Sequence, residues 1–207
     1  MKSRVGILAY GSLIACPGPE IGPLIARKVD VRTPFPVEFA KYSRTRCGAA
    51  TVVRSPLGRS VRAKVLILKD GVTVGAAQDM LWKRETDNVG SRKHYPGLRT
   101  RKAVRVITIP GFAGVESVLY VDFYASTKIR NPRPATLAIR AIRSVNVSIK
   151  DARFDKDGIT YLIKVKKSGV ITPLTGQYEK EILRRTGTRS LKSALDILRK
   201  KYRTGAP

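Results

Sequence analysis

Two short stretches of the sequence combine residue types that could bind and process a small anionic substrate. The first is Tyr10-Gly11-Ser12-Leu13, which follows the apolar run Val5–Ala9. That run is long enough for a buried strand, and Gly11 allows a tight turn at its end. Backbone N–H groups gathered in such a turn can hold a carboxylate or a phosphate, although many glycine-serine turns only reverse the chain.

The second stretch is a helical pattern over residues 76–85 that ends at Glu85. Its apolar face contains Ala77, Met80 and Leu81, and Glu85 continues that face. Burial and the negative end of a helix both raise the pKa of a carboxyl group, which favours proton exchange near neutral pH. The alternative is that Glu85 turns outward and pairs with Lys83 or Arg84.

Composition indicates a globular protein with an unusual charge. The 207 residues are 43% hydrophobic, and Lys and Arg number 41 against 15 Asp and Glu, a net charge of +26. No apolar run approaches the ~18 residues of a membrane-spanning helix, and the N-terminus lacks a convincing signal-peptide cleavage site. We therefore expect a cytoplasmic protein without a membrane partner.

The positive charge suggests a second function, the binding of nucleic acid or another polyanion. The basic residues are spread along the chain, and no zinc-finger spacing or aromatic-rich RNA-binding strand motif occurs. The C-terminal end is strongly basic, with Arg184, Arg185, Arg189, Lys192, Arg199, Lys200, Lys201 and Arg203. Steep salt dependence of nucleic-acid binding would distinguish this function from an enzymatic one.

Cysteine and histidine are too few for an expected metal site. Cys16 and Cys47 form no metal-binding pattern, and we expect both to be free thiols that behave as small buried apolar residues. His94 is the single histidine and lies among cations before a proline, which favours a solvated side chain over a catalytic base.

The rest of the chain predicts a mixed α+β protein. Strands are expected over 5–9, 37–42, 49–54, 61–68, 101–110 and 117–124, and a helical turn over 20–27. Beyond the helix over 76–85, further helices are expected over 135–149, 159–167, 178–185 and 191–202, the last with Ser190 as N-cap. The strands 49–54 and 61–68 are expected to pair as a hairpin. The outline is a five- or six-stranded sheet or barrel followed by basic helices.

Several of these segments together resemble the γ-glutamylcyclotransferase family, especially its ChaC-like branch. The matching segments are Tyr10-Gly11-Ser12-Leu13-Ile14 with Pro17 downstream, Arg46-Cys47-Gly48-Ala49, Leu81-Trp82-Lys83-Arg84-Glu85, Leu119-Tyr120-Val121 and the late segment 172–178. The resemblance covers roughly residues 5–125. It implies a mixed β-barrel with flanking helices over residues 1–130, and a basic helical extension over 131–207 packed on the same domain.

The resemblance also implies a reaction. In that family the turn matching Tyr10 to Leu13 holds the α-carboxylate of a γ-glutamyl group through backbone amides. The glutamate matching Glu85 takes a proton from the α-ammonium, and the freed amine attacks the γ-carbonyl of the same molecule. The products are 5-oxoproline and an amine or peptide, as in glutathione metabolism, and neither metal nor cofactor is required. Tyr10 or Tyr120 would donate a hydrogen bond to the substrate; alternatively, either is a core tyrosine with a satisfied hydroxyl.

Overall fold

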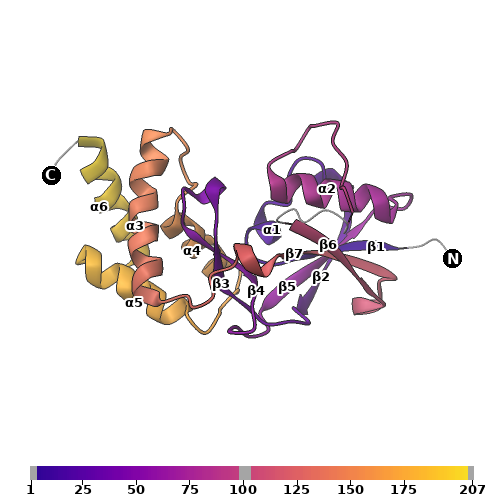
Figure 1. The fold of residues 1–207 in the computed structure, drawn as a ribbon, viewed down its shortest axis with the longest axis horizontal. Helices are drawn as coiled ribbons and strands as arrows, with labels where there is room; N and C mark the ends of the chain where they lie inside the picture. The colour runs from indigo at the N-terminus through magenta and orange to yellow at the C-terminus, as the bar shows by residue number, and fades with distance from the viewer. Residues whose placement is uncertain (1–3, 98–103, 205–207) are drawn as a thin grey trace. The chain divides into compact units, whose positions relative to one another are not determined.

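The chain folds into two compact units of mixed α+β structure (Figure 1). A computed structural model describes residues 4–97 and 104–204. The first unit contains the chain up to Pro34 and Val61–Thr127; the second contains Phe35–Ser60 and the chain from Lys128 onward. The division expected from the sequence was a single boundary at residue 130, with residues 35–60 in the N-terminal part.

The first unit is built on a five-stranded sheet with β1 (Val5–Ala9) at its centre. The other strands are β2 (Ile25–Arg32), β5 (Arg62–Leu68), β6 (Val104–Pro110) and β7 (Ser117–Phe123). The order is β2-β5-β1-β7-β6, with β1 parallel to β7 and the other neighbours antiparallel. The helix α2 (Val74–Thr86) packs on β1, β6 and β7 (Figure 1). Every residue of β1 is buried, as expected for a strand covered on both faces.

The described strands do not close the expected barrel. In the five-stranded order, β2 and β6 each have one neighbour and are therefore edges. The expected hairpin of 49–54 with 61–68 is also wrong, because β5 pairs with β1 and β2. The strand β4 (Ala50–Arg54) pairs instead with β3 (Val37–Tyr42) in a separate two-stranded sheet in the second unit.

The helical turn expected over 20–27 is present in part. A short 3-10 turn covers Gly22–Leu24, and the strand β2 begins at Ile25, so the last three expected residues are extended. In β2 the half-buried Val29 and Val31 alternate with exposed polar residues, which is typical of an edge strand with one covered face. Of the strand expected over 101–110, residues 101–103 lie outside the described residues.

Four helices accompany the β3–β4 hairpin in the second unit. They are α3 (Pro134–Lys150), α4 (Gly158–Lys167), α5 (Thr175–Thr186) and α6 (Leu191–Thr204), and each contains the helix expected from the sequence. In the core, the Phe39 ring packs edge-to-face on Tyr161 and Tyr178, at centroid distances of 6.4 and 5.1 Å. Across residues 4–97 and 104–204, no helix is both long and apolar enough to cross a bilayer.

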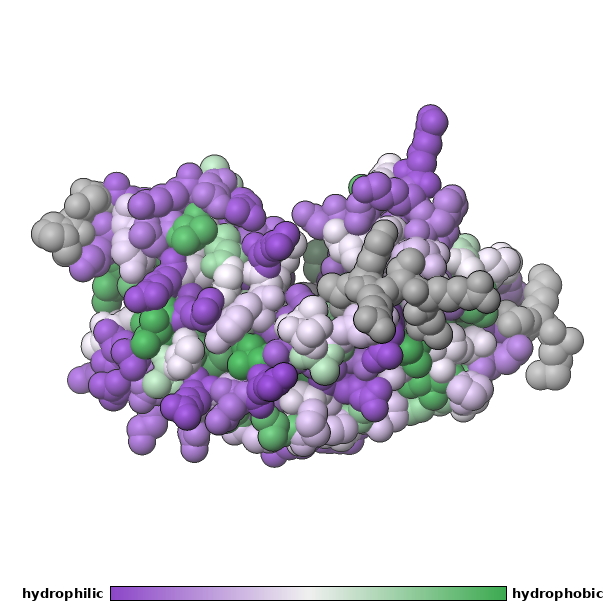
Figure 2. All heavy atoms as spheres, viewed as in Figure 1, coloured by the Kyte–Doolittle hydropathy of each residue, from purple (hydrophilic) through white to green (hydrophobic). Residues whose placement is uncertain are grey.

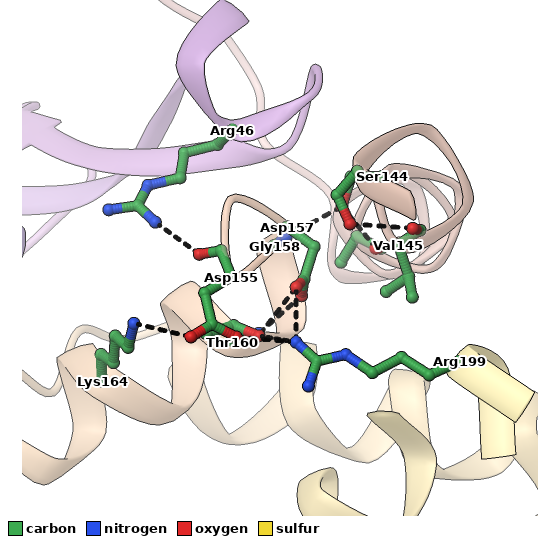
Figure 3. A network of polar contacts seen from close by, with 11 residues as sticks. Arg46, Ser144, Val145, Asp155, Asp157, Gly158, Thr160, Lys164 and Arg199 are labelled. Atoms are coloured by element: carbon green, nitrogen blue, oxygen red, sulfur yellow. Dashed lines mark hydrogen bonds and ion pairs between the residues drawn. The ribbon is translucent and has the colours of Figure 1, made fainter. Parts of the chain in front are cut away.

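A buried carboxylate begins α4 and connects it to α6. Asp157 is fully buried and accepts hydrogen bonds from the backbone N–H and the hydroxyl of Thr160, both at 2.7 Å (Figure 3). Arg199 of α6 lies 3.7 Å from the Asp157 carboxylate and donates a 2.8 Å hydrogen bond to Asp155. The N-terminus of α4 is therefore capped by a charge that α6 neutralises.

The same loop also contacts the hairpin and α3. Arg46, in the turn between β3 and β4, donates a hydrogen bond to the carbonyl oxygen of Asp155 at 3.1 Å (Figure 3). On the other side, the Ser144 hydroxyl in α3 accepts a 2.8 Å hydrogen bond from the N–H of Gly158. Polar contacts around residues 155–158 therefore connect the hairpin with three of the helices.

Candidate functional site

The turn after β1 is shaped by a glycine and fixed by a leucine. Gly11 has φ +61° and ψ −132°, a conformation that residues with a Cβ rarely adopt. The short helix α1 (Ser12–Ala15) begins directly after it, with Leu13 buried in the core and Ser12 half-buried. The carboxyl end of the central strand therefore leads into a rigid turn that presents the Ser12 hydroxyl.

Arg84, in the last turn of α2, binds this turn. Its Nη2 donates hydrogen bonds to Ser12 Oγ at 3.3 Å and to the carbonyl oxygen of Cys16 at 2.8 Å. Its Nε donates a further hydrogen bond to the Cys16 oxygen at 3.3 Å. With 16% of its side chain exposed, Arg84 is held against the turn rather than extended into solvent.

Glu85 lies beside the same guanidinium. Arg84 Nη1 donates a hydrogen bond to Glu85 Oε1, and the Glu85 side chain is 21% exposed. The pairing of Glu85 with a preceding cation, one of the two interpretations of the sequence, is therefore present. Because that cation also binds Ser12 and Cys16, the pairing brings the Glu85 carboxylate to the turn instead of removing it.

The two candidate tyrosines lie on neighbouring parallel strands. Tyr10 directly follows the carboxyl end of β1, whereas Tyr120 lies in the middle of β7. Tyr10 is half-buried, and its hydroxyl donates a 3.4 Å hydrogen bond to the carbonyl oxygen of Val121 in β7. Tyr120 is 5% exposed, opposite Ile107 in the β6–β7 pairing. The burial of Tyr120 agrees with the core-tyrosine alternative, whereas Tyr10 is partly accessible.

Arg84 is the residue whose role the sequence did not reveal. The sequence suggests it as a possible counter-charge for Glu85 and as part of the segment that resembles the family, but not as a partner of the turn. Adjacent helical residues project about 100° apart, so the two side chains flank one end of α2. Only the fold shows that the chain from Ser12 to Cys16 lies within reach of this arginine.

The segment 46–49, which contributed to the family resemblance, belongs to the second unit. Arg46 binds the Asp155 carbonyl oxygen, and its guanidinium lies 5.0 Å from the centroid of the Tyr161 ring. Cys47 has a left-handed backbone, with φ 52°. The contacts of Arg46 thus stabilise the hairpin against the helices.

His94 is solvated, as predicted, but it has a partner. Its side chain is 80% exposed, and Nδ1 contacts the Asp79 carboxylate of α2, which also accepts a 2.6 Å hydrogen bond from the N–H of Tyr95. Partial burial raises the pKa of Asp79. The hydrogen bonds from His94 and Tyr95 lower it by a larger amount, so the net pKa is below its usual range. These contacts tie the loop after α2 to the helix.

Both cysteines are free thiols, as expected, but Cys16 is exposed rather than buried. Cys47 is half-buried, and burial raises the pKa of its thiol. In the part of the chain that the structure describes, no three His, Cys, Asp or Glu side chains gather in a group that could hold a metal ion.

The positive charge is concentrated in the second unit. Residues 35–60 and 128–207 contain 25 Lys or Arg against 7 Asp or Glu. Within the predicted basic end, however, several cations have partners. Arg184 and Arg185 pair with Glu181 at 3.1 and 3.3 Å, and Arg199 pairs with Asp155. At least three of the eight cations of that end are therefore already paired with carboxylates.

Comparison with known proteins gives this chain no relative: no protein-family model matches it, and no curated protein or solved structure is significantly similar to it. Two features of the chain itself therefore bear on function: the contacts of Arg84 with the turn and Glu85, and the charge of the second unit.

Proposed function

We propose that the protein is a γ-glutamylcyclotransferase-like enzyme that converts a γ-glutamyl group to 5-oxoproline and releases an amine or peptide. The observation that carries the proposal is the shared guanidinium of Arg84, which binds both the turn at Ser12 and the carboxylate of Glu85. The proposal is also supported by the position of the turn, which follows the central strand β1 next to the parallel strand β7.

The charges at this site are complementary to the α-carbon end of an amino acid. A γ-glutamyl group carries a carboxylate and an ammonium on one carbon atom. The turn N–H groups and the Arg84 cation suit the carboxylate, and the Glu85 anion suits the ammonium. Because the cation and anion are adjacent in sequence and in contact, they match two opposite charges held on neighbouring substrate atoms.

In the proposed reaction Glu85 removes a proton from the α-ammonium, which gives a nucleophilic amine. The amine nitrogen attacks the γ-carbonyl carbon, the new C–N bond closes a five-membered ring, and the original γ-amide C–N bond breaks. The leaving nitrogen receives the proton held by Glu85 and the second proton released by the attacking nitrogen. Holding the substrate folded for attack supplies much of the acceleration, because effective molarities of well-oriented ring closures reach roughly 10⁵ M or more.

The test is formation of 5-oxoproline from a panel of γ-glutamyl amino acids and glutathione. We expect turnover by the unmodified protein, and a loss of at least about a hundredfold in Glu85→Gln, which cannot accept the proton. Glu116→Gln is the matched control, since Glu116 is an exposed carboxylate in the turn before β7. Undiminished activity in Glu85→Gln would exclude the mechanism, and no turnover of any substrate would exclude the function.

The charge of the second unit favours a second candidate function, the binding of nucleic acid or another polyanion. Its 25 basic and 7 acidic residues create a field that attracts polyanions over a distance set by salt screening. We expect retention of the protein on a DNA or heparin column, with elution at a raised salt concentration. Failure to bind either column at low salt would rule this candidate out.

A further inference from the structure

We propose that the exposed face of α3 binds the phosphodiester backbone of a nucleic-acid duplex, independently of base sequence. The inference rests on the second candidate function and gives it a place in the fold. Four cations lie on this face, which we call the α3 stripe: Arg133, Arg140, Arg143 and Lys150. Unlike the predicted basic end, the stripe contains no cation paired with a carboxylate within the described residues.

The stripe follows from the periodicity of α3. The exposed positions from its N-cap onward are 133, 136, 140, 143, 147 and 150, with steps of three and four residues that keep them on one side of the helix. The two positions without a cation are Thr136 and Val147. The opposite side is buried, through residues that include Leu137, Ala141 and Val145. The four cations therefore form a row about 25 Å long on one side of the helix, with gaps at Thr136 and Val147.

No acidic residue interrupts this surface. The 17 residues of α3 include neither Asp nor Glu. Most carboxylates of the second unit pair with cations outside the stripe: Asp151 with Arg153, Asp155 and Asp157 with Arg199, Glu179 with Lys166, and Glu181 with Arg184 and Arg185. One of them, Asp151, is the C-cap of α3 and follows Lys150 directly, but its ion pair is with Arg153. The four cations of the stripe therefore keep their positive potential. Figure 2 shows mainly hydrophilic side chains over this helix, with isolated hydrophobic ones between them.

One arginine of the stripe is held in place by an aromatic ring. The Arg140 guanidinium lies 3.9 Å from the centroid of Tyr42, at the end of β3. A guanidinium held over a ring by a cation–π contact leaves N–H groups at its periphery, where they can bind two phosphate oxygens at once. The stacking also reduces the side-chain entropy that binding would otherwise cost.

The composition of the stripe favours a duplex over other polyanionic partners. Proteins that bind single strands stack bases on aromatic rings, and the six exposed positions of this helix face carry no aromatic residue. A helix that lies on a membrane needs an apolar face, and Val147 is the single hydrophobic residue on the stripe. A row of cations about 25 Å long can instead span roughly seven base pairs along a duplex, at a rise of about 3.4 Å per base pair along its axis.

The experiment compares two variants of the full chain that lose the same charge. The first changes Arg133, Arg140, Arg143 and Lys150 to Gln. The control changes Lys167, Lys180, Arg189 and Lys192 to Gln, four exposed cations of the same unit that lie outside the stripe. Fluorescence anisotropy measures binding to two unrelated DNA duplexes, an RNA duplex, a single-stranded oligonucleotide and anionic vesicles, over about 50 to 200 mM salt. Far-UV circular dichroism checks that both variants remain folded. A third variant changes only Arg133, Arg143 and Lys150, so that the contact of Arg140 with Tyr42 is kept.

We expect the unmodified protein to bind both DNA duplexes equally, with affinity falling steeply as salt rises. The stripe variant should bind at least about tenfold more weakly, with a salt slope lower by about three to four, and the control should change much less. Duplex RNA bound as tightly as duplex DNA would extend the site to both. If the stripe variant and the control lose the same affinity, the site is not on α3, although the protein still binds polyanions. Tighter binding to vesicles or to the single strand would overturn the duplex assignment, and no binding by the unmodified protein would overturn both.

Discussion

Arg84 Nη2 lies 2.8 Å from the carbonyl oxygen of Cys16, and this hydrogen bond fixes the end of α2 against the chain that leaves α1. The same side chain bonds Ser12 and Glu85. One guanidinium thus determines both the local packing of two segments and the distance between the turn and the carboxylate. Changes at Arg84 should therefore affect stability and activity together.

Replacement of Arg84 by Lys should keep the charge but lose the geometry. A lysine ammonium is a compact point charge without the planar set of N–H donors of a guanidinium, so it cannot donate hydrogen bonds to Ser12, Cys16 and Glu85 at the same time. We expect the free energy of unfolding to fall by about 1–2 kcal/mol, and kcat/KM for 5-oxoproline formation to fall at least about tenfold. Denaturant titration and the turnover assay measure the two effects, with Lys83→Gln as the neighbouring control. Unchanged stability in Arg84→Lys would contradict the structural role of the arginine.

Glu38 should make stability depend on pH. Its fully buried carboxylate accepts hydrogen bonds from the N–H groups of Phe39 and Leu174, at 2.7 and 3.1 Å, and from the Thr172 hydroxyl. Burial raises the pKa of Glu38 by more than these hydrogen bonds lower it, so the net pKa lies above its usual range. A raised pKa in the folded state means that folding favours the protonated form.

The contribution of Glu38 to stability is therefore complete below its unfolded-state pKa and is lost as pH rises through the folded-state value. Glu38→Gln does not titrate and lacks this loss, but at every pH its NH2 group would place a donor against the Leu174 N–H. We expect the unmodified protein to be more stable than the variant near pH 4, with a difference that shrinks toward about pH 7. Denaturant titrations across this range measure the free energy of unfolding of both proteins. The exposed control Glu116→Gln should show the same pH dependence as the unmodified protein. A constant difference for Glu38→Gln would refute the prediction.

Removal of the Asp157 carboxylate should be strongly destabilising. Asp157→Ala removes the cap of α4 and leaves Thr160 and Arg199 without their buried partner. We expect a loss of about 2–4 kcal/mol in the free energy of unfolding, and a smaller loss in Asp157→Asn, which keeps an oxygen for the Thr160 N–H. Asp196→Ala, at an exposed position in α6, should change stability by less than about 0.5 kcal/mol. Comparable losses in Asp157→Ala and Asp196→Ala would show that the cap is unimportant.

Two glycines in helices should respond to alanine in opposite directions. A Cβ at Gly158 would lie 2.6 Å from the Ala49 Cβ and 3.0 Å from the Ala141 Cα, so Gly158→Ala must force the hairpin and α3 away from α4. We expect it to destabilise the fold by about 1–3 kcal/mol. At Gly176 in α5 nothing lies within 4 Å, and Gly176→Ala should stabilise by about 0.5–1 kcal/mol through helix propensity. Thermal unfolding measures both shifts, and stabilisation by Gly158→Ala would disprove the close approach.

Local patterns in the sequence predicted the elements that depend on local physics. The helices α2 to α6 have clear apolar faces and marked ends, and Ser190 accepts a hydrogen bond from the Ser193 N–H, as expected of an N-cap. The β1 strand and its glycine turn were likewise recognisable from an apolar run followed by Gly11. These features need only neighbouring residues to form.

Strand pairing and the contacts of Arg84 could not be predicted in the same way. The apolar content of β5 suits a strand with neighbours on both sides, but it does not specify β1 and β2 as those neighbours. The strand β2, rich in charge, is extended because it pairs with β5, so tertiary contacts outweigh its local preference. At the site, the turn and Glu85 were visible separately, and only the fold supplies the arginine between them.

The placement of the β3–β4 hairpin has a consequence for synthesis on the ribosome. Phe39 packs on Tyr178, which is translated about 140 residues later. At about 5–20 residues per second, Tyr178 is synthesised roughly 7–28 s after Phe39, and the Phe39 ring lacks this packing partner during that time. The last strand of the first sheet, β7, ends at Phe123, well before α4 and α5 have been made. The nascent chain should therefore carry a finished first sheet beside an uncovered hairpin, and that hairpin is the segment most exposed to chaperones and to aggregation during translation.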